Sequence, residues 1–226
     1  FWVALPVAMI GGALFAALVE LILMRLLVKH ASSGPIAGVA PIIATLGLLG
    51  VIRSVISMIW GGQDLRIVGP VSNDGFTVNG TTLVFSPLKL LILVTVLVLM
   101  LILSVIFQKT NIGLALRASA YAPEIARLSG IKVDFIRTLG WSLAGAAGGL
   151  AGMLYIPSSY LYPNAMDVLL VFGFVAAVIG GLDSLFGAVA GAMILGFSIS
   201  FATSYVSEKL VFPMAFVMLV VVLLIK

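Results

Sequence analysis

Long runs of apolar residues dominate the chain, and short polar segments separate them. Each run approaches the roughly 20 residues that an α-helix needs to cross a bilayer. A membrane β-barrel would instead show short segments of alternating polarity. We therefore predict an all-α, polytopic transmembrane helix bundle of about seven spans, over Trp2–Leu27, Ile36–Trp60, Pro87–Phe107, Ile136–Ile156, Val168–Leu182, Leu185–Tyr205 and Leu210–Ile225. The fifth run is short, so we expect a tilted, broken or partly re-entrant helix there.

Composition supports the membrane prediction. Hydrophobic residues make up 62% of the chain and charged residues 9%, with a mean hydropathy of +1.30. Soluble domains carry about 25% charged residues, so this chain has too few charges to cover a water-facing surface. It has no cysteine and one histidine, His30. Disulfides, thiol catalysis and cysteine-ligated metals are excluded, and we expect no metal site and no cofactor bound by this chain.

We expect residues 1–226 to form a single transmembrane domain. The chain begins at Phe1 inside an apolar run, without Met or a signal peptide, and ends at Lys226 directly after another run. We therefore expect it to be part of a longer protein.

The distribution of Lys and Arg predicts the orientation, because the cytoplasmic loops of membrane proteins are enriched in both. These loops would be 29–35, 109–135 and 182–185, while 61–86, 157–167 and 206–209 would face outward. The cytoplasmic set carries most of the basic side chains, namely Arg25, Lys29, His30, Lys109, Arg117, Arg127, Lys132, Arg137 and Lys226, against Arg66 and Lys209 outside and Lys89 at a helix start. Because these residues are spread over loops, we predict no nucleic-acid binding.

Few ionisable residues fall inside the predicted spans, where such groups are costly and mark functional candidates. Glu20 and Arg25 are five residues apart, so an α-helix would not stack them on one face. We expect Glu20 to have its partner on another helix. Arg53 could pair with Glu20, line a water-filled path or contact a substrate carboxylate. So few intramembrane acids argue against a proton-coupled carrier.

Small residues recur every four positions in two spans, which lets helix backbones approach closely. This spacing predicts helix packing, either as fixed contacts within the subunit or as surfaces that slide during transport. The predicted stripes are Gly140, Ala144, Gly148 and Gly152, with Gly145 and Gly149 beside them, and Gly187 and Gly191.

The segment 111–135 is too polar to span a membrane. Pro123 suits the first position of a helix and Gly130 a left-handed cap just beyond its end. Glu124 and Arg127 would each complement the helix dipole. Ile125 and Leu128 would share an apolar face. We therefore predict a short amphipathic helix of about two turns, which either docks into a groove on a partner or rests on lipid headgroups.

The outer segment 61–86 contains a hairpin pattern. Phe76–Val78 and Thr81–Val84 flank Asn79-Gly80, the dipeptide favoured in a type I′ turn. The hairpin would contact a binding protein, form an outer gate or simply connect two spans.

Three stretches resemble the permeases of branched-chain amino acid ABC importers: Gly113–Ala118 with Pro123–Ile131, Leu143–Gly152 and Val178–Gly191. The order and extent of these matches identify the chain as a member of that family. The string Ala126–Ile131 is also similar to sugar permeases of the same superfamily, although Gly113–Ala118 fits the amino-acid group better. The resemblance implies that 111–135 contains the coupling helix that docks on the ATP-binding subunit, with Arg117, Pro123, Glu124, Ala126, Arg127 and Gly130 as coupling residues.

The same resemblance implies partners and a location. These are ABC ATP-binding subunits, an identical or paralogous second permease, an extracytoplasmic solute-binding protein and lipid of a bacterial inner membrane. The substrate would be leucine, isoleucine or valine, although similar permeases carry amides, urea or sugars. Polarity alone suggests Thr45, Arg53 and Tyr155 for the substrate path.

The chain has no phosphate-binding loop of the G-x-x-x-x-G-K-[ST] type, and no nucleophile–base pair is evident. We therefore predict a transport subunit without an ATPase site, in which ATP is bound by partner subunits. The alternatives are an ion-gradient-driven carrier or channel for a small polar solute, a membrane scaffold and, last, a membrane enzyme.

Overall fold

The computed structural model describes residues 1–26, 40–67, 69–71, 75, 77–78, 81–82 and 86–225. Several predictions fall outside these residues: the loop 29–35 with Lys29 and His30, the turn residues Asn79 and Gly80, and Lys226. The described residues form two compact units, Phe1–Pro163 and Asn164–Lys226. We describe each unit by itself, and the prediction of one domain over the whole chain stays a prediction.

The first unit contains most of the helices. In chain order they are α1 (Ala4–Val19), the π-helix η1 (Glu20–Met24), α3 (Ala40–Trp60), α4 (Pro87–Lys109), α5 (Asn111–Tyr121), α6 (Pro123–Leu128), α7 (Val133–Tyr155) and the 3₁₀ turn η2 (Ile156–Ser158). Two short strands, β1 (Thr77–Val78) and β2 (Thr81–Thr82), lie between α3 and α4. The second unit contains α8 (Asp167–Gly180), α9 (Leu185–Tyr205), the 3₁₀ turn η3 (Glu208–Leu210) and α10 (Val211–Ile225).

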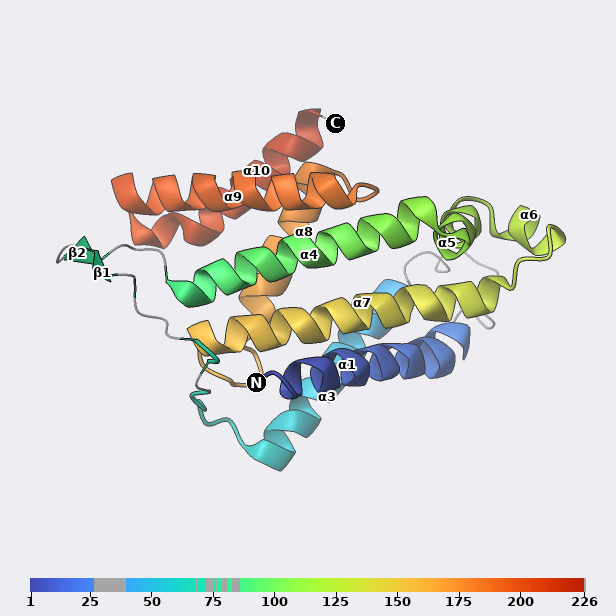
Figure 1. Cartoon of the computed structure of the whole chain (residues 1–226), viewed down its shortest axis with the longest axis horizontal. Helices are drawn as coiled ribbons and strands as arrows, with labels where there is room; N and C mark the ends of the chain where they lie inside the picture. Colours follow the sequence, from blue (N-terminus) through green and yellow to red (C-terminus); the bar gives the residue numbers. More distant parts are fainter. Residues whose placement is uncertain are drawn as a thin grey trace. The chain divides into compact units, whose positions relative to one another are not determined.

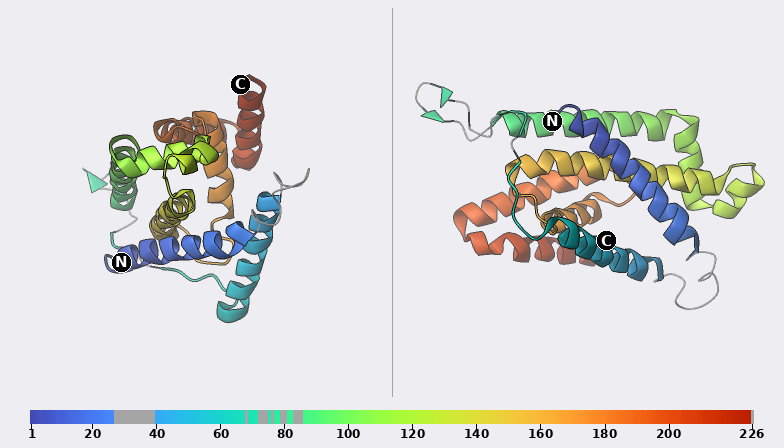
Figure 2. Two further views of the ribbon diagram at one scale, coloured as in Figure 1. Left: turned by 90° about the vertical axis from the view of Figure 1, so that its right-hand side faces the viewer. Right: turned by 90° about the horizontal axis from the view of Figure 1, so that it is seen from below.

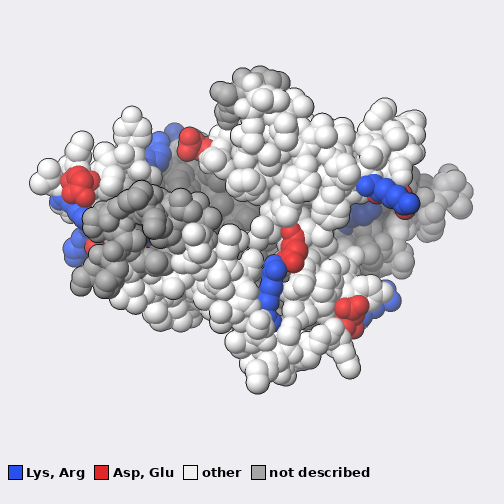
Figure 3. All heavy atoms as spheres, turned by 180° about the vertical axis from the view of Figure 1, so that it is seen from behind, with Lys and Arg blue, Asp and Glu red and all other residues white. Residues whose placement is uncertain are grey.

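The predicted all-α membrane fold is confirmed in its class. Five described helices are long and apolar enough to cross a membrane: Ala4–Met24, Ile43–Trp60, Pro87–Lys109, Val133–Ser158 and Leu185–Tyr205. The count of seven is not confirmed, because α8 and α10 are shorter, with 14 and 15 residues. Apolar side chains remain exposed along the long helices (for example Leu14, Leu46, Leu101 and Phe197), and the face in Figure 3 carries only small groups of charged residues. Such surfaces require lipid or another protein to cover them.

Helices α1 and α7 form the closest helix pair of the first unit (Figure 1). The right-hand view in Figure 2, taken from below, shows α1 crossing over α7. Small residues meet at the crossing: a side chain on Gly145 would collide with the backbone of Gly12, and one on Gly149 with the backbone of Ala8. Close backbone approach through small residues is the usual packing mode of membrane helices.

The two ends of the first unit differ in what they contain. Beyond one end of α4 and α7 lie α5 and α6, and beyond the other end lies the β1–β2 hairpin (Figure 1). At that second end Leu65 and Leu161 exchange two backbone hydrogen bonds, of 3.0 and 2.8 Å. The structure thus joins 61–86 to 157–167, two segments that the charge pattern assigned to one side of the membrane.

The β1–β2 pairing agrees with the predicted hairpin. Val78 lies opposite Thr81 and Thr77 opposite Thr82, in an antiparallel register that leaves two residues for the turn. A two-residue connection is the commonest hairpin loop.

In the second unit, α8 and α9 form a tight hairpin. Gly181, at φ +95°, ends α8, and the Ser184 side chain caps α9 by accepting a hydrogen bond from the Gly187 amide at 2.9 Å. The fifth predicted span therefore ends before Leu182. Val175, Ala176, Leu195 and Ala215 form the core of this unit.

Candidate functional site

The polar segment 111–135 forms two helices, α5 and α6, and the start of α7. Thr110 is the N-cap of α5: its hydroxyl oxygen accepts a hydrogen bond of 3.1 Å from the Gly113 amide and lies 2.5 Å from the Ile106 carbonyl, to which it donates. Gly113 is buried against the end of α4, where a Cβ would collide with the Ile106 and Phe107 carbonyls. The sequence pattern predicted only one helix here; the Thr110 cap is the local signal for the second.

The predicted short helix is α6, and its limits follow from Pro123 and Gly130. Pro123 is at the first position, and Gly130 has φ +82°. The amide of Ile131 donates to the Ala126 carbonyl and the amide of Gly130 to the Arg127 carbonyl, both at 3.0 Å. These two bonds form a Schellman motif, which fixes the direction of the chain as it leaves the helix. Glu124 and Arg127 form an i,i+3 ion pair of 3.6 Å.

A charged contact ties α6 to the first turn of α7. Arg127 Nη2 lies 3.4 Å from Asp134 Oδ1, and Arg137 Nη2 lies 3.7 Å from the same oxygen. Ala126 and Val133 are buried beside this pair. The role of Asp134 was not predicted. The only indication in the sequence is that it is an acidic residue in the first turn of a helix, where it complements the helix dipole.

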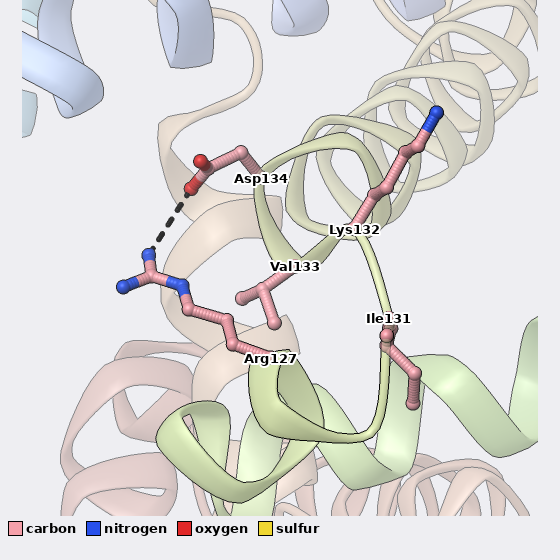
Figure 4. A pocket seen from close by; sticks show the side chains of 6 residues that line it. Arg127, Ile131, Lys132, Val133 and Asp134 are labelled. Carbon is pink, nitrogen blue, oxygen red and sulfur yellow. Dashed lines mark hydrogen bonds and ion pairs between the residues drawn. The ribbon is translucent and has the colours of Figure 1, made fainter.

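A shallow concavity of about 350 Å³ marks the joint between α6 and α7. Figure 4 shows the Arg127–Asp134 pair on one side of it, while Lys132 extends away. Its lining residues are Arg127, Gly130, Ile131, Lys132, Val133 and Asp134.

Helix α6 and the end of α5 also expose apolar side chains. Ile125 is 66% exposed and Leu128 is 89% exposed, and Tyr121 at the end of α5 is 95% exposed. We call Tyr121, Ile125 and Leu128 the docking face. Arg117, Pro123 and Glu124 are also exposed. The structure therefore brings five predicted coupling residues, Pro123, Glu124, Ala126, Arg127 and Gly130, into one rigid element, and places Arg117 one helix earlier.

Glu20 and Arg25 lie at the end of the first unit that carries α5 and α6. The prediction that these two side chains do not share one helix face is wrong. They form an ion pair, with Arg25 Nε 3.5 Å from Glu20 Oε2, because residues 20–24 form a π-helix rather than an α-helix. Its i→i+5 hydrogen bonds bring residues five apart onto one side. The expectation of a partner on another helix also holds, since the Thr138 hydroxyl of α7 donates to Glu20 Oε2 at 2.6 Å.

The predicted substrate-path residues lie on two helices. Thr45 and Arg53 are half-buried, about two turns apart on α3. Tyr155 is half-buried at the end of α7. Their role in a path stays a prediction.

The small-residue stripes differ in what they contact. Gly187 lies against Gly180 and Gly191 against Ala176, both at the α8–α9 crossing. In α7 the contact with α1 falls on Gly145 and Gly149, whereas Ala144 and Gly148 are exposed, with open space at Gly148. Gly140 and Gly152 are half-buried. The Gly140–Gly152 stripe is therefore adjacent to the one that packs on α1.

Comparisons with known proteins agree with the resemblance. A family described as "Branched-chain amino acid transport system / permease component" matches residues 1–225. The probable branched-chain amino acid transport permease protein LivH of Methanocaldococcus jannaschii is 31% identical over 92% of this chain and 64% of its own length. The high-affinity branched-chain amino acid transport system permease protein LivH of Escherichia coli K12 is 28% identical over 81% of this chain and 61% of its own.

The name of another relative refers to a different solute. The autoinducer 2 import system permease protein LsrC of Yersinia enterocolitica is 29% identical over 68% of this chain and 43% of its own length. The chain spans less than two thirds of the length of these relatives. No solved structure matches it.

Proposed function

This chain belongs to the family of permease components of branched-chain amino acid transport systems, and from that premise we propose that it is the membrane-spanning subunit of an ATP-driven importer. Branched-chain amino acids would pass through it into the cytoplasm. ATP would be bound and hydrolysed by separate subunits.

The exposed docking face carries the proposal. Helix α6 is fixed at both ends, by Pro123 and by the Schellman motif at Gly130, yet it presents Ile125 and Leu128 to the outside. An apolar helix face held in a fixed orientation suits insertion into a hydrophobic groove. The groove would belong to an ATP-binding subunit, since 113–131 resembles the coupling segment of the family.

Each proposed coupling residue then has a physical role. Arg127 holds α6 to α7 through its ion pair with Asp134, and Ala126 is the buried residue of α6. Because this contact is direct, a force on Ile125 or Leu128 would displace the first turn of α7. Glu124 and Arg117, which are exposed, would contribute polar contacts at the edge of the ATP-binding subunit.

The remaining partners are inferred from the family and from exposed surfaces. A second permease, identical or paralogous, would cover apolar helix faces that lipid does not. An extracytoplasmic solute-binding protein would approach the opposite end of the first unit, where β1 and β2 lie. This assignment places the chain in the cell inner membrane with α5 and α6 in the cytoplasm.

The test is co-purification of the full-length protein with its ATP-binding subunit from native membranes. Leu128→Asp places a charge on the docking face without touching a buried contact, so we expect the ATP-binding subunit to be largely lost. Leu65→Asp, at an exposed apolar position of the opposite end, is the matched control and should retain it. Absence of any ATP-binding subunit from the wild-type preparation would refute the proposed function.

A further inference from the structure

Two sets of polar contacts meet in the first two turns of α7. The Asp134 carboxylate contacts Arg127 of α6 at 3.4 Å. The Asp134 backbone carbonyl and the Thr138 hydroxyl oxygen accept hydrogen bonds from Arg25 Nη2, at 3.3 and 3.0 Å. Asp134, which contacts α6, and Thr138, which contacts Arg25, are therefore only one helical turn apart on α7.

Thr138 occupies the centre of the second set. Its oxygen accepts from the Arg25 guanidinium. Its single proton has two acceptors, the Glu20 carboxylate at 2.6 Å and the Asp134 carbonyl of its own helix at 3.0 Å, and the shorter contact is the one to Glu20. A hydroxyl can donate and accept at once, so this one side chain bridges a cation and an anion. Hydrogen bonds to charged groups are the stronger ones.

Glu20 depends on this bridge. Its side chain is fully buried, and within the described part of the chain its Oε1 has no hydrogen-bond partner. The other oxygen, Oε2, is held by Thr138 and Arg25. Loss of one partner from a buried ion pair is strongly destabilising because it leaves a buried charge uncompensated, so the Glu20 carboxylate requires the contacts with Thr138 and Arg25 to stay in place.

The π-helix makes α1 sensitive to the same contacts. The Arg25 amide donates to the Glu20 carbonyl in the i→i+5 pattern, which brings both side chains toward Thr138. In an α-helical register the two would be about 140° apart around the axis, and the pair would break. The helical register at residues 20–25 is thus coupled to the Thr138 bridge. Short π-helical segments of this kind frequently occur at functional sites.

We infer that Thr138 is a positioning residue that transmits displacement of α6 and α7 to α1 during transport, through Arg25 and the buried Glu20. The inference rests on the proposed function, because the ATP-binding subunit supplies the displacement. Asp134 receives the movement from Arg127, and Thr138 passes it on one turn later. The segment that responds is the π-helix η1, Glu20–Met24, which directly follows α1.

The experiment uses the full-length permease, purified with its ATP-binding subunit and reconstituted in proteoliposomes with its solute-binding protein. The quantity measured is leucine taken up per ATP hydrolysed. Thr138→Val keeps the shape and removes the hydroxyl, and Thr138→Ser restores it. Thr95→Val is the matched control, because the Thr95 hydroxyl donates only within α4 in the described contacts, to the Leu91 carbonyl at 2.7 Å.

We expect Thr138→Val to assemble normally and hydrolyse ATP, with uptake per ATP lowered about tenfold by loss of a charged hydrogen bond. Thr138→Ser and Thr95→Val should match the wild type. Glu20→Gln should also lower uptake per ATP, and the double variant should be no worse than Thr138→Val alone, because both remove the same bridge.

Two results would overturn the inference. One is wild-type uptake per ATP in Thr138→Val. The other is loss of the ATP-binding subunit in Thr138→Val, which would assign the hydroxyl to assembly rather than transmission. A wild-type preparation without an ATP-binding subunit is a different outcome, since it refutes the proposed function and the inference with it.

Discussion

At the scale of single residues, a few side chains and glycines determine how the first unit packs. Gly12, Gly145 and Gly149 allow backbone contact between α1 and α7, and the Glu20–Arg25–Thr138 bridge joins the same two helices by charge. One apolar contact and one polar contact thus fix the same helix pair.

Gly145→Ala should destabilise the protein, whereas Gly148→Ala should not. A Cβ on Gly145 would collide with the Gly12 backbone, while one on Gly148 meets open space. Overpacking of this kind costs about 1–3 kcal/mol. Thermal unfolding of the full-length protein in detergent should show a lower midpoint for Gly145→Ala alone. Equal midpoints for the two variants would mean that α1 packs on another face of α7.

The residue scale also shows what sequence alone could not decide. Positions 144, 145, 148 and 149 are all small, so their spacing identified α7 as a packing helix but not the face that meets α1. The Glu20–Arg25 pair was missed because the sequence does not reveal a π-helix. A separation of five positions looks unfavourable for an ion pair under α-helical geometry.

At the scale of elements, α6 was predictable because its signals are local. Pro123 and Gly130 determine where it begins and ends, and the structure confirms both. Helix α5 was not named, because it is defined by the Thr110 cap and by contact of Gly113 with α4, which the sequence pattern does not display. The Arg127–Asp134 pair was also not foreseen, because it joins two helices across the turn at Gly130.

Gly130→Ala should weaken the end of α6. Gly130 has φ +82°, a left-handed conformation that costs other residues about 1–2 kcal/mol. Asn tolerates this conformation better, so Gly130→Asn should have a smaller effect. The backbone amides of residue 130 and Ile131 donate the two hydrogen bonds of the Schellman motif. Hydrogen exchange at these two amides should accelerate most in the Ala variant. Unchanged exchange in both variants would contradict this account of the cap.

Asp134→Asn should loosen the joint between α6 and α7 without unfolding either helix. It removes ion pairs with Arg127 and Arg137, and exposed pairs contribute about 0.2–1 kcal/mol each. Hydrogen exchange of α6 in the wild type should rise with salt, because salt screens the pairs. The same exchange in Asp134→Asn should be high and nearly independent of salt. A salt response equal to that of the wild type would show that these pairs do not hold α6.

At the scale of the whole molecule, hydropathy predicted the class of fold, and the resemblance identified the family. The count of seven spans is not confirmed, since α8 and α10 are apolar but short. The predicted runs Val168–Leu182 and Leu210–Ile225 were already short; in the structure Gly181 ends α8 and η3 precedes α10.

The orientation can be tested directly because the chain has no cysteine. Leu128→Cys and Leu65→Cys introduce single thiols at exposed positions of the two ends of the first unit. With a membrane-impermeant maleimide added to intact cells lacking an outer barrier, Leu65→Cys should be labelled and Leu128→Cys should react only after the membrane is opened. The reverse pattern would invert the proposed topology.

The most direct test of the proposed function is leucine uptake by proteoliposomes that contain the full-length permease, its ATP-binding subunit and its solute-binding protein. The account predicts uptake that requires ATP and persists when sodium and proton gradients are abolished. Uptake that follows an ion gradient and proceeds without ATP would contradict it and favour a secondary carrier.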